Sequence, residues 1–334
     1  MIEVTHLTRH FDTITAVDDI AFTINEGEIV GFLGPNGAGK TTTLRMLVGY
    51  LQPSSGNIII MDKNINEDPI GIARQIGYLP EQSPLYDDMT VYDYLKFIAE
   101  IRHLSKAMFE ERLEFVIDKC GLRDVIGQQI QTLSKGYKQR TGLAQAIIHD
   151  PKVLILDEPT SGLDPNQIME IRELIIELGK AKTVILSSHI MQEVQAVCDR
   201  IIIINKGKIV ADELKEELGK YISEQTVLTL EIEADNPDFT QWLALHPDAS
   251  LTDISNKGNH WKTVFTYPIE QDLQRDLSQY ISANQWLILS MYKQQHSLEE
   301  IFHVLTTDSE GKAVEAAPEI PETEIPAEEK DSDA

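Results

Sequence analysis

The sequence predicts an α/β domain with a largely parallel central sheet, followed by a smaller α+β domain and a disordered acidic tail. Three observations support this prediction. Short apolar runs alternate with helical stretches up to about residue 218, which is typical of domains built on a parallel sheet. Strand and helix patterns then follow in the order βαββαβ over residues 222–306, and residues 307–334 contain ten acidic but only two basic residues.

Four runs of nearly continuous apolar character are predicted as strands of the first domain, residues 1–218. Such runs suit strands that are covered on both faces. They are EIVGFLG (28–34), KVLILDE (152–158), TVILSSH (183–189) and RIIIIN (200–205).

A helical insert is expected within this domain between about residues 85 and 150. Thr90 and Asp93 form a capping-box pattern there, ahead of apolar residues at helical spacing.

The second domain, residues 222–306, has alternating strand and helix patterns. Strands are predicted at TVLTLEIEA (226–234), SLTDIS (250–255), WKTVFTYP (261–268) and WLILSMYK (286–293), with helices around 239–245, over 271–281 and from Ser297. This is the ferredoxin-like order. The tail at 307–334, in which EIP occurs twice, cannot bury enough apolar surface to order itself and is expected to be disordered.

Charge and composition exclude several classes of protein. The net charge of −25 argues against a nucleic-acid binder, which needs clustered Lys and Arg. Cys120 and Cys198 lie far apart without further ligands at metal spacing, so we expect two core residues in a reducing cytosol. No apolar run is long enough to cross a bilayer and the N-terminus has no apolar signal region, so we expect a soluble protein whose membrane role comes through a partner.

GPNGAGKT (34–41) fits the phosphate-loop pattern G-x-x-x-x-G-K-[ST], between an apolar strand and a segment that can be helical. Its glycines let backbone N–H groups curl around an anion, and the helix N-terminus adds partial positive charge. Lys40 would reach the β- and γ-phosphates, and the hydroxyl of Thr41 would ligate Mg²⁺. The alternative interpretation is a glycine-rich turn. The predicted phosphate-binding residues are Gly34, Pro35, Asn36, Gly37, Ala38, Gly39, Lys40, Thr41 and Thr42.

Two acidic residues end the apolar run at 152–158. Asp157 is placed to hold Mg²⁺, commonly through water, and Glu158 can accept a proton from an attacking water. Acidic residues also end buried strands where the chain merely emerges into solvent, but the phosphate loop upstream favours the catalytic interpretation.

Taken in order with LSKGYKQR (133–140), these motifs resemble the ATP-binding cassette (ABC) family over about residues 1–215. LSKGYKQR resembles the family signature LSGGQ, with Lys135 replacing the first Gly and Tyr137 replacing Gln. SGLD (161–164) matches the D-loop, and His189 matches the switch histidine. The resemblance implies that ATP and Mg²⁺ are bound and that His189 acts beside Glu158.

Four further residues are assigned through the same resemblance. Phe11 matches the aromatic residue that stacks on adenine, while Ser134 and Gly136 of the signature would face ATP. GYLPEQ (77–82) occupies the Q-loop, but Glu81 stands where the family generally has Gln. A Glu can ligate a cation, so Glu81 is added to the metal residues Thr41 and Asp157. Without the resemblance, Phe11 would be interpreted as a core residue, His189 as structural and Ser134 as an ordinary N-cap.

The chain contains one cassette, and in the family the signature of a second subunit closes the γ-phosphate side. The resemblance therefore implies a head-to-tail dimer of two copies, each completing the other's site. GYLPE, LYDDMTVYDYL and SLEEIFHVLT resemble ATPase subunits of bacterial ABC-2 type exporters, including gliding-motility-associated and multidrug or sodium export subunits. This implies a separate transmembrane permease, contacting the helical insert and residues 81–86, that holds the cytoplasmic chain at the inner face of the membrane.

Two alternatives remain at the level of sequence. The chain could be a cassette ATPase that acts on nucleic acid or ribosomes without a permease, although its acidic balance and lack of a basic arm weigh against this. Residues 222–306 could form a regulatory ligand-binding module, which is compatible with transport because a fold does not determine function.

Overall fold

The computed structural model describes residues 1–221, 225–268, 270–294 and 298–307. By its internal contacts the described chain divides into two compact units, residues 1–212 and 213–307. Except for Thr307, the acidic tail that was predicted to be disordered lies outside the described residues. Within the described ranges, no helix combines the length and the apolar character needed to span a membrane.

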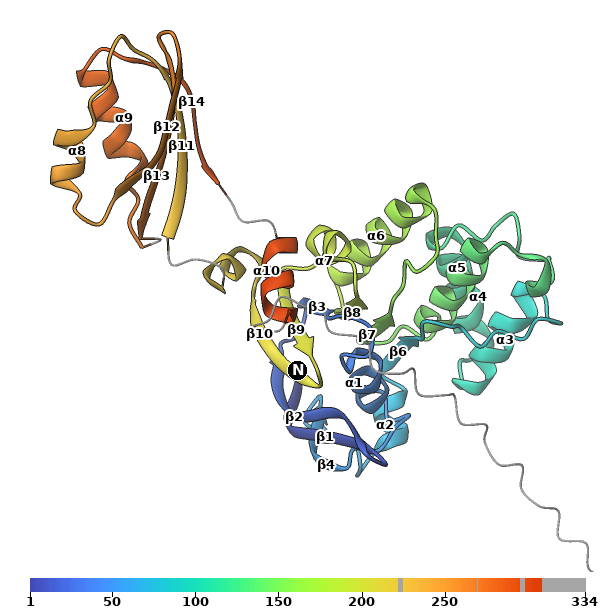
Figure 1. The fold of residues 1–334 in the computed structure, drawn as a ribbon. Helices are drawn as coiled ribbons and strands as arrows, with labels where there is room; N and C mark the ends of the chain where they lie inside the picture. The colour runs from blue at the N-terminus through green and yellow to red at the C-terminus, as the bar shows by residue number, and fades with distance from the viewer. Residues whose placement is uncertain (222–224, 269, 295–297, 308–334) are drawn as a thin grey trace, which may run out of the picture. The chain divides into compact units, whose positions relative to one another are not determined.

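The first unit contains two sheets (Figure 1). One is antiparallel, with the strand order β2-β1-β4-β5, and consists of β1 (Ile2–Phe11), β2 (Ile14–Ile24), β4 (Ser55–Ile60) and β5 (Lys63–Asn64). The other has the order β10-β9-β3-β8-β7-β6 and consists of β3 (Ile29–Leu33), β6 (Ile76–Leu79), β7 (Val153–Asp157), β8 (Thr183–Ser188), β9 (Arg200–Asn205) and β10 (Lys208–Leu214).

Five strands of the second sheet, β9, β3, β8, β7 and β6, pair in parallel, which confirms the predicted central sheet. The antiparallel sheet was not predicted. Its pairing of β1 with β2 and with β4 contains register shifts, so the buried residues of β1 do not alternate regularly with exposed ones. A period of two, which is the sequence signal for a half-buried strand, is therefore weak in this part of the chain.

The predicted helical insert between residues 85 and 150 is confirmed, with α3, α4 and α5 lying together at one side of the unit (Figure 1). Thr90 caps α3, because its Oγ1 accepts a hydrogen bond from the Asp93 N–H at 3.1 Å. The helices of the unit are α1 (Lys40–Leu47), α2 (Pro69–Ala73), α3 (Val91–Ile101), α4 (Lys106–Lys119), α5 (Lys135–Ile147), α6 (Pro165–Gly179) and α7 (Met191–Val197), with a 3₁₀ turn at Ile130–Thr132.

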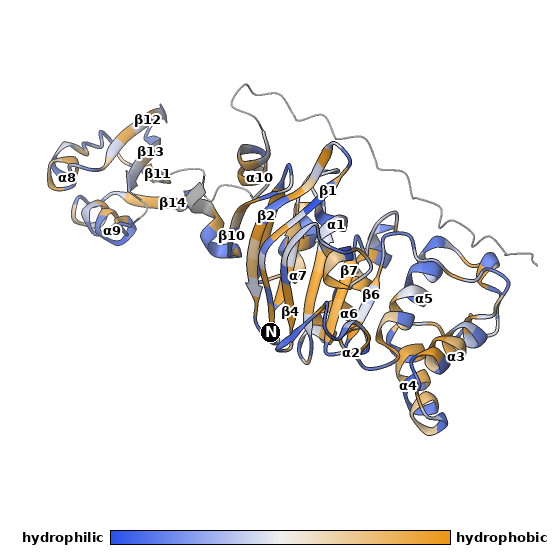
Figure 2. Cartoon of the chain, turned by 90° about the horizontal axis from the view of Figure 1, so that it is seen from below, coloured by the Kyte–Doolittle hydropathy of each residue, from blue (hydrophilic) through white to orange (hydrophobic). Residues whose placement is uncertain are grey.

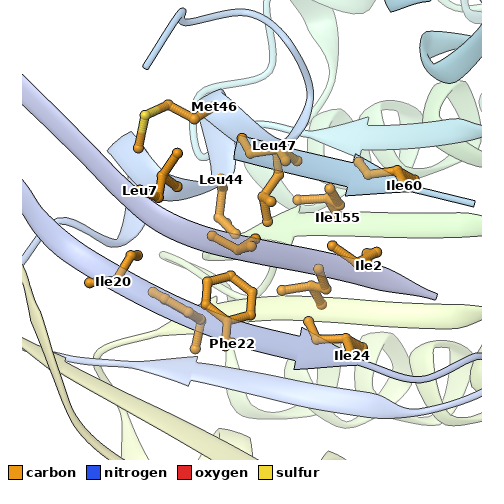
Figure 3. Close-up of a cluster of buried hydrophobic side chains, with 14 of the residues drawn as sticks. Ile2, Leu7, Ile20, Phe22, Ile24, Leu44, Met46, Leu47, Ile60 and Ile155 are labelled. Atoms are coloured by element: carbon orange, nitrogen blue, oxygen red, sulfur yellow. The ribbon is translucent and has the colours of Figure 1, made fainter. Parts of the chain in front are cut away.

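One hydrophobic core joins the two sheets through α1 (Figure 3). Leu44 and Leu47 of α1 are fully buried among side chains such as Phe22 of the antiparallel sheet and Ile155 of the central sheet. Figure 2 shows the strands around β7 coloured mainly as hydrophobic, as expected for a sheet covered on both faces. Both cysteines are buried, as predicted.

The parallel pairing brings three strand ends together. Leu33 of β3 pairs with Ser188 of β8, and Asp157 of β7 pairs with Ser187. The segments that leave the carboxyl ends of β3, β7 and β8 therefore emerge side by side, at the edge where open α/β sheets bind their ligands.

The second unit has the predicted βαββαβ order followed by a helix. Its sheet is antiparallel with the strand order β12-β13-β11-β14. Aromatic rings fill the core between this sheet and its two helices, with Phe239 and Trp242 packed edge-on against Phe265. The elements are a 3₁₀ segment (Lys215–Tyr221), β11 (Gln225–Glu233), α8 (Thr240–Leu245), β12 (Ser250–Lys257), β13 (His260–Pro268), α9 (Gln274–Ala283), β14 (Leu287–Gln294) and α10 (Leu298–Thr306).

Candidate functional site

The loop between β3 and α1 has the backbone shape of an anion cradle. Gly37 and Gly39 have φ of 75° and 108°, in the region that favours glycine. At Gly39 an added Cβ would lie 2.5 Å from the Ala16 carbonyl oxygen, and at Gly34 it would collide with the Ile204 carbonyl. The glycines are therefore required by close backbone approach as well as by φ.

Lys40 lies inside this loop and is almost completely buried. Its Nζ donates to the Gly34 carbonyl at 2.8 Å and to the Pro35 carbonyl at 3.3 Å. Burial lowers the pKa of Lys40, while the nearby carboxylates of Glu158 and Asp157 act in the opposite direction. The ammonium group is thus held where it can meet a phosphate that enters the loop.

Asp157 is fully buried at the end of β7 and faces Thr41, the residue that follows Lys40. Its Oδ1 accepts hydrogen bonds from the Thr41 hydroxyl at 3.3 Å and from Ser187 Oγ. Its Oδ2 is buried and has no hydrogen-bond partner among the described residues. A buried carboxylate oxygen without a donor, beside a threonine hydroxyl, fits a Mg²⁺ ion that keeps several waters and binds phosphate oxygens.

Glu158 joins the loop lysine to the histidine after β8. Its Oε1 lies 3.6 Å from Lys40 Nζ, and its Oε2 lies 2.9 Å from His189 Nδ1. The Glu158 side chain is 8% exposed, whereas that of His189 is 44% exposed. The carboxylate is therefore buried, whereas the histidine beside it is partly exposed to solvent.

The loop that carries His189 is stabilised by a buried side-chain contact. Ser188 Oγ donates to Glu193 Oε2 at 2.8 Å and accepts from the Ile190 N–H at 3.0 Å. The backbone on both sides of His189 is thereby tied to the start of α7.

The signature segment forms the first turn of α5. Ser134 is the N-cap, and its Oγ accepts from the Tyr137 N–H at 3.4 Å. Ser134 and Lys135 are exposed, whereas Gly136 is buried against the side chain of Gln167. Within the described residues, the Ser134 hydroxyl makes no hydrogen bond to the phosphate loop, so this helix end is not part of the Lys40 and Glu158 cluster of its own chain.

The two remaining predicted residues lie at the periphery. Phe11 ends β1, and the Arg9 guanidinium lies over its ring with Cζ 4.5 Å from the centroid. Glu81 is exposed, and its negative charge raises the pKa of Lys40, although less than burial lowers it. Phe11 and Glu81 are therefore not part of the cluster. Of the predicted residues, the structure brings together Lys40, Thr41, Asp157, Glu158 and His189.

Two residues that contact the acidic segment of the site were missed at the level of sequence. Ser187 bridges the acidic pair, since its Oγ donates to Asp157 and accepts from the Glu158 N–H. A serine inside an otherwise apolar strand was the available signal. Gln139 of α5 donates to the Pro159 carbonyl at 2.9 Å, and no pattern in the sequence indicates that contact.

This arrangement can perform a specific chemistry. Backbone N–H groups, an ammonium and a helix N-terminus can bind a polyphosphate, a buried aspartate can help to hold a divalent cation, and a glutamate can take a proton from water.

Comparison with known proteins finds the family that the motifs resemble. A family model described as "ABC transporter" matches residues 17–161. The linearmycin resistance ATP-binding protein LnrL of Bacillus subtilis is 31% identical over 92% of this chain and 98% of its own. The bacitracin transport ATP-binding protein BcrA of Bacillus licheniformis is 36% identical over 78% of this chain and 87% of its own.

A solved structure extends the similarity to the fold. The structure of cbiO1 from Clostridium perfringens, described as part of the ABC transporter complex cbiONQ, is 29% identical and has a TM-score of 0.59. It covers 66% of this chain and 92% of cbiO1.

Proposed function

The chain belongs to the family of ABC transporter ATP-binding proteins and is an ATPase of that family, and on this premise we propose that it powers a separate ABC-2 type export permease. The observation that carries the proposal is the cluster of Lys40, Asp157, Glu158 and His189 at the carboxyl ends of three neighbouring strands. The names of LnrL and BcrA, which refer to resistance and transport, support export as the direction.

In the proposed mechanism, each side chain has one task. The loop N–H groups and Lys40 bind the β- and γ-phosphates, so Lys40 turns from Glu158 toward the substrate. Glu158 accepts a proton from the attacking water, while His189 holds the Glu158 carboxylate through Nδ1. Thr41, Asp157 and, from the Q-loop, Glu81 would hold Mg²⁺, which when bound neutralises charge on the β- and γ-oxygens.

The exposed end of α5 is the basis for proposing a dimer. Ser134 and the first N–H groups of α5 can donate hydrogen bonds to an anion. Among the described residues, however, the Ser134 hydroxyl bonds only within its own helix. In a head-to-tail dimer this end would face the γ-phosphate bound by the other copy, opposite the loop of Lys40, with adenine stacked on Phe11. Phosphoryl transfer needs donors all around the developing charge, which one chain does not supply.

A groove beside the helical insert is the proposed contact with the permease. It has a volume of about 490 Å³ and is lined by residues from the ends of α1 and α3 and from α2. Ile70 and Ile101 line it and are 69% and 55% exposed. Large apolar side chains grouped on a surface are typical of protein interfaces. We assign this groove to a cytoplasmic segment of the permease, which would hold the chain at the inner face of the membrane.

Copurification of a membrane protein tests this proposal. The chain, tagged at its N-terminus, should retain a polytopic membrane protein after gentle solubilisation, and an Ile70→Glu, Ile101→Glu variant should lose it while still binding ATP. Retention of ribosomes or DNA in a salt-sensitive manner, with no membrane protein, would instead support an ATPase that acts on nucleic acid.

A further inference from the structure

The backbone on either side of Glu158 is held by two side chains from other elements. Glu158 has φ of 48°, in the left-handed region that a residue with a Cβ keeps only when its surroundings enforce it. On one side, the Glu158 N–H donates to Ser187 Oγ of β8 at 3.0 Å. On the other, Gln139 Nε2 of α5 donates to the Pro159 carbonyl at 2.9 Å.

The bond from Gln139 is buried, since this residue is only 6% exposed. A buried carbonyl that loses its donor retains the full desolvation penalty, so the contact strongly restricts where Pro159 can lie. Because Pro159 follows Glu158 directly, the bond restricts the position of the carboxylate as well.

The same helix makes two further contacts with the segment after Glu158. An added Cβ at Gly136 would strike the side chain of Gln167, and one at Gly162 would strike the end of the Lys135 side chain. The first turn of α5 therefore packs directly on residues 162–167. A shift of this helix end would change these side-chain contacts with the segment that leads away from the proposed base.

We propose that Gln139 is a positioning residue that holds Glu158 in its reactive orientation and connects it to the signature end of α5. The proposal rests on the assignment of Glu158 as the base and of α5 to the partner's site. In the dimer, α5 of one chain faces the ATP that the other chain binds. The contact of α5 with that ATP is transmitted through Gln139 to Glu158, the base of the chain to which this α5 belongs. Each site thereby senses whether the other is occupied.

Gln139→Met tests the positioning role, because Met has a similar length and helix propensity but no donor. We expect kcat to fall on the order of tenfold, with the Kd for ATP within about twofold of wild type. Gln139→Glu, which turns only acceptor oxygens toward Pro159, should lose at least as much activity. The control is Gln128→Met, which removes an exposed bond from Gln128 Nε2 to the Asp124 carbonyl and should leave kcat unchanged.

Cooperativity tests the connection between sites. Wild-type ATP hydrolysis should rise cooperatively with ATP, and the Hill coefficient should fall toward unity in Gln139→Met. Folded variants that bind ATP and keep the wild-type kcat would overturn the positioning role, and equal Hill coefficients would overturn the connection. A variant that loses ATP binding along with its thermal transition would also contradict a positioning role. Absence of ATP hydrolysis by the wild-type chain would instead contradict the proposed function itself.

Discussion

The Lys40 ammonium lies 3.6 Å from the Glu158 carboxylate, and both side chains are less than one-tenth exposed. The charges of the loop cation and of the proposed base therefore compensate each other in a buried place. In the proposed mechanism, an entering γ-phosphate would compete with Glu158 for Lys40, and substrate binding would free the carboxylate to act on water.

Replacement of Glu158 by Gln should separate binding from hydrolysis. Gln keeps the size of the side chain but cannot accept a proton from water, so kcat should fall by about a hundredfold or more while ATP is still bound. The variant should accumulate as an ATP-bound dimer, measurable by size-exclusion chromatography with light scattering. Glu173→Gln, an exposed position on α6, is the matched control. Wild-type turnover by Glu158→Gln would exclude Glu158 as the base.

Replacement of Asp157 by Asn should weaken the response to Mg²⁺. The Mg²⁺ concentration for half-maximal ATP hydrolysis should rise on the order of tenfold, because the unpartnered Oδ2 position loses its negative charge. Thr41→Ser keeps a hydroxyl at the other ligand and should stay near the wild-type value. Identical Mg²⁺ titrations of Asp157→Asn and the wild-type chain would contradict the assignment.

Mixing two inactive chains should restore activity if the sites are shared. Ser134→Arg disables the signature and Lys40→Ala disables the phosphate loop, so each homodimer should be inactive. In a mixed dimer both lesions fall in one site, and the other site is intact. ATP hydrolysis measured after mixing should therefore exceed that of either variant alone. Strictly additive loss would show that the signature does not act across the dimer.

His149 should make stability sensitive to acid. Its Nε2 lies 3.0 Å from the Ile76 carbonyl, while its Nδ1 is buried without a partner in the described part of the chain. Burial, with a smaller contribution from Arg102, lowers the pKa of His149 from 6.5 to about 4. Because the folded-state pKa is depressed, the unfolded chain binds the proton first as the pH falls. The stability that the neutral ring contributes is complete above pH 6.5 and is lost progressively toward pH 4.

The expected loss in the free energy of unfolding is up to about 3 kcal/mol across that range. His149→Gln can still donate to the Ile76 carbonyl but does not titrate. Urea denaturation between pH 7 and pH 4 should therefore show a smaller decline for His149→Gln than for wild type. His103→Gln, at an exposed histidine, should decline as wild type does. Equal slopes for wild type and His149→Gln would refute the prediction.

The sequence by itself determined the features that depend on short segments. The phosphate loop, the acidic pair of Asp157 and Glu158 and the buried parallel strands are each written in a few consecutive residues, because backbone conformation and continuous burial impose local patterns. The βαββαβ order of the second unit was predictable for the same reason. The role of Ser134 was inferred by resemblance, since in the proposed dimer its partner would lie in the other chain.

Only the tertiary structure decided how distant segments meet. The contacts of Ser187 with Asp157, of Gln139 with Pro159 and of His189 with Glu158 join residues between 20 and 31 positions apart, and they depend on the order of strands in the sheet and on the packing of α5. The antiparallel sheet could not be predicted from the sequence either. The register shifts in β1 break the alternation of buried and exposed residues by which a strand is recognised. Contacts of this kind arise from packing geometry, for which a single sequence carries no local signal.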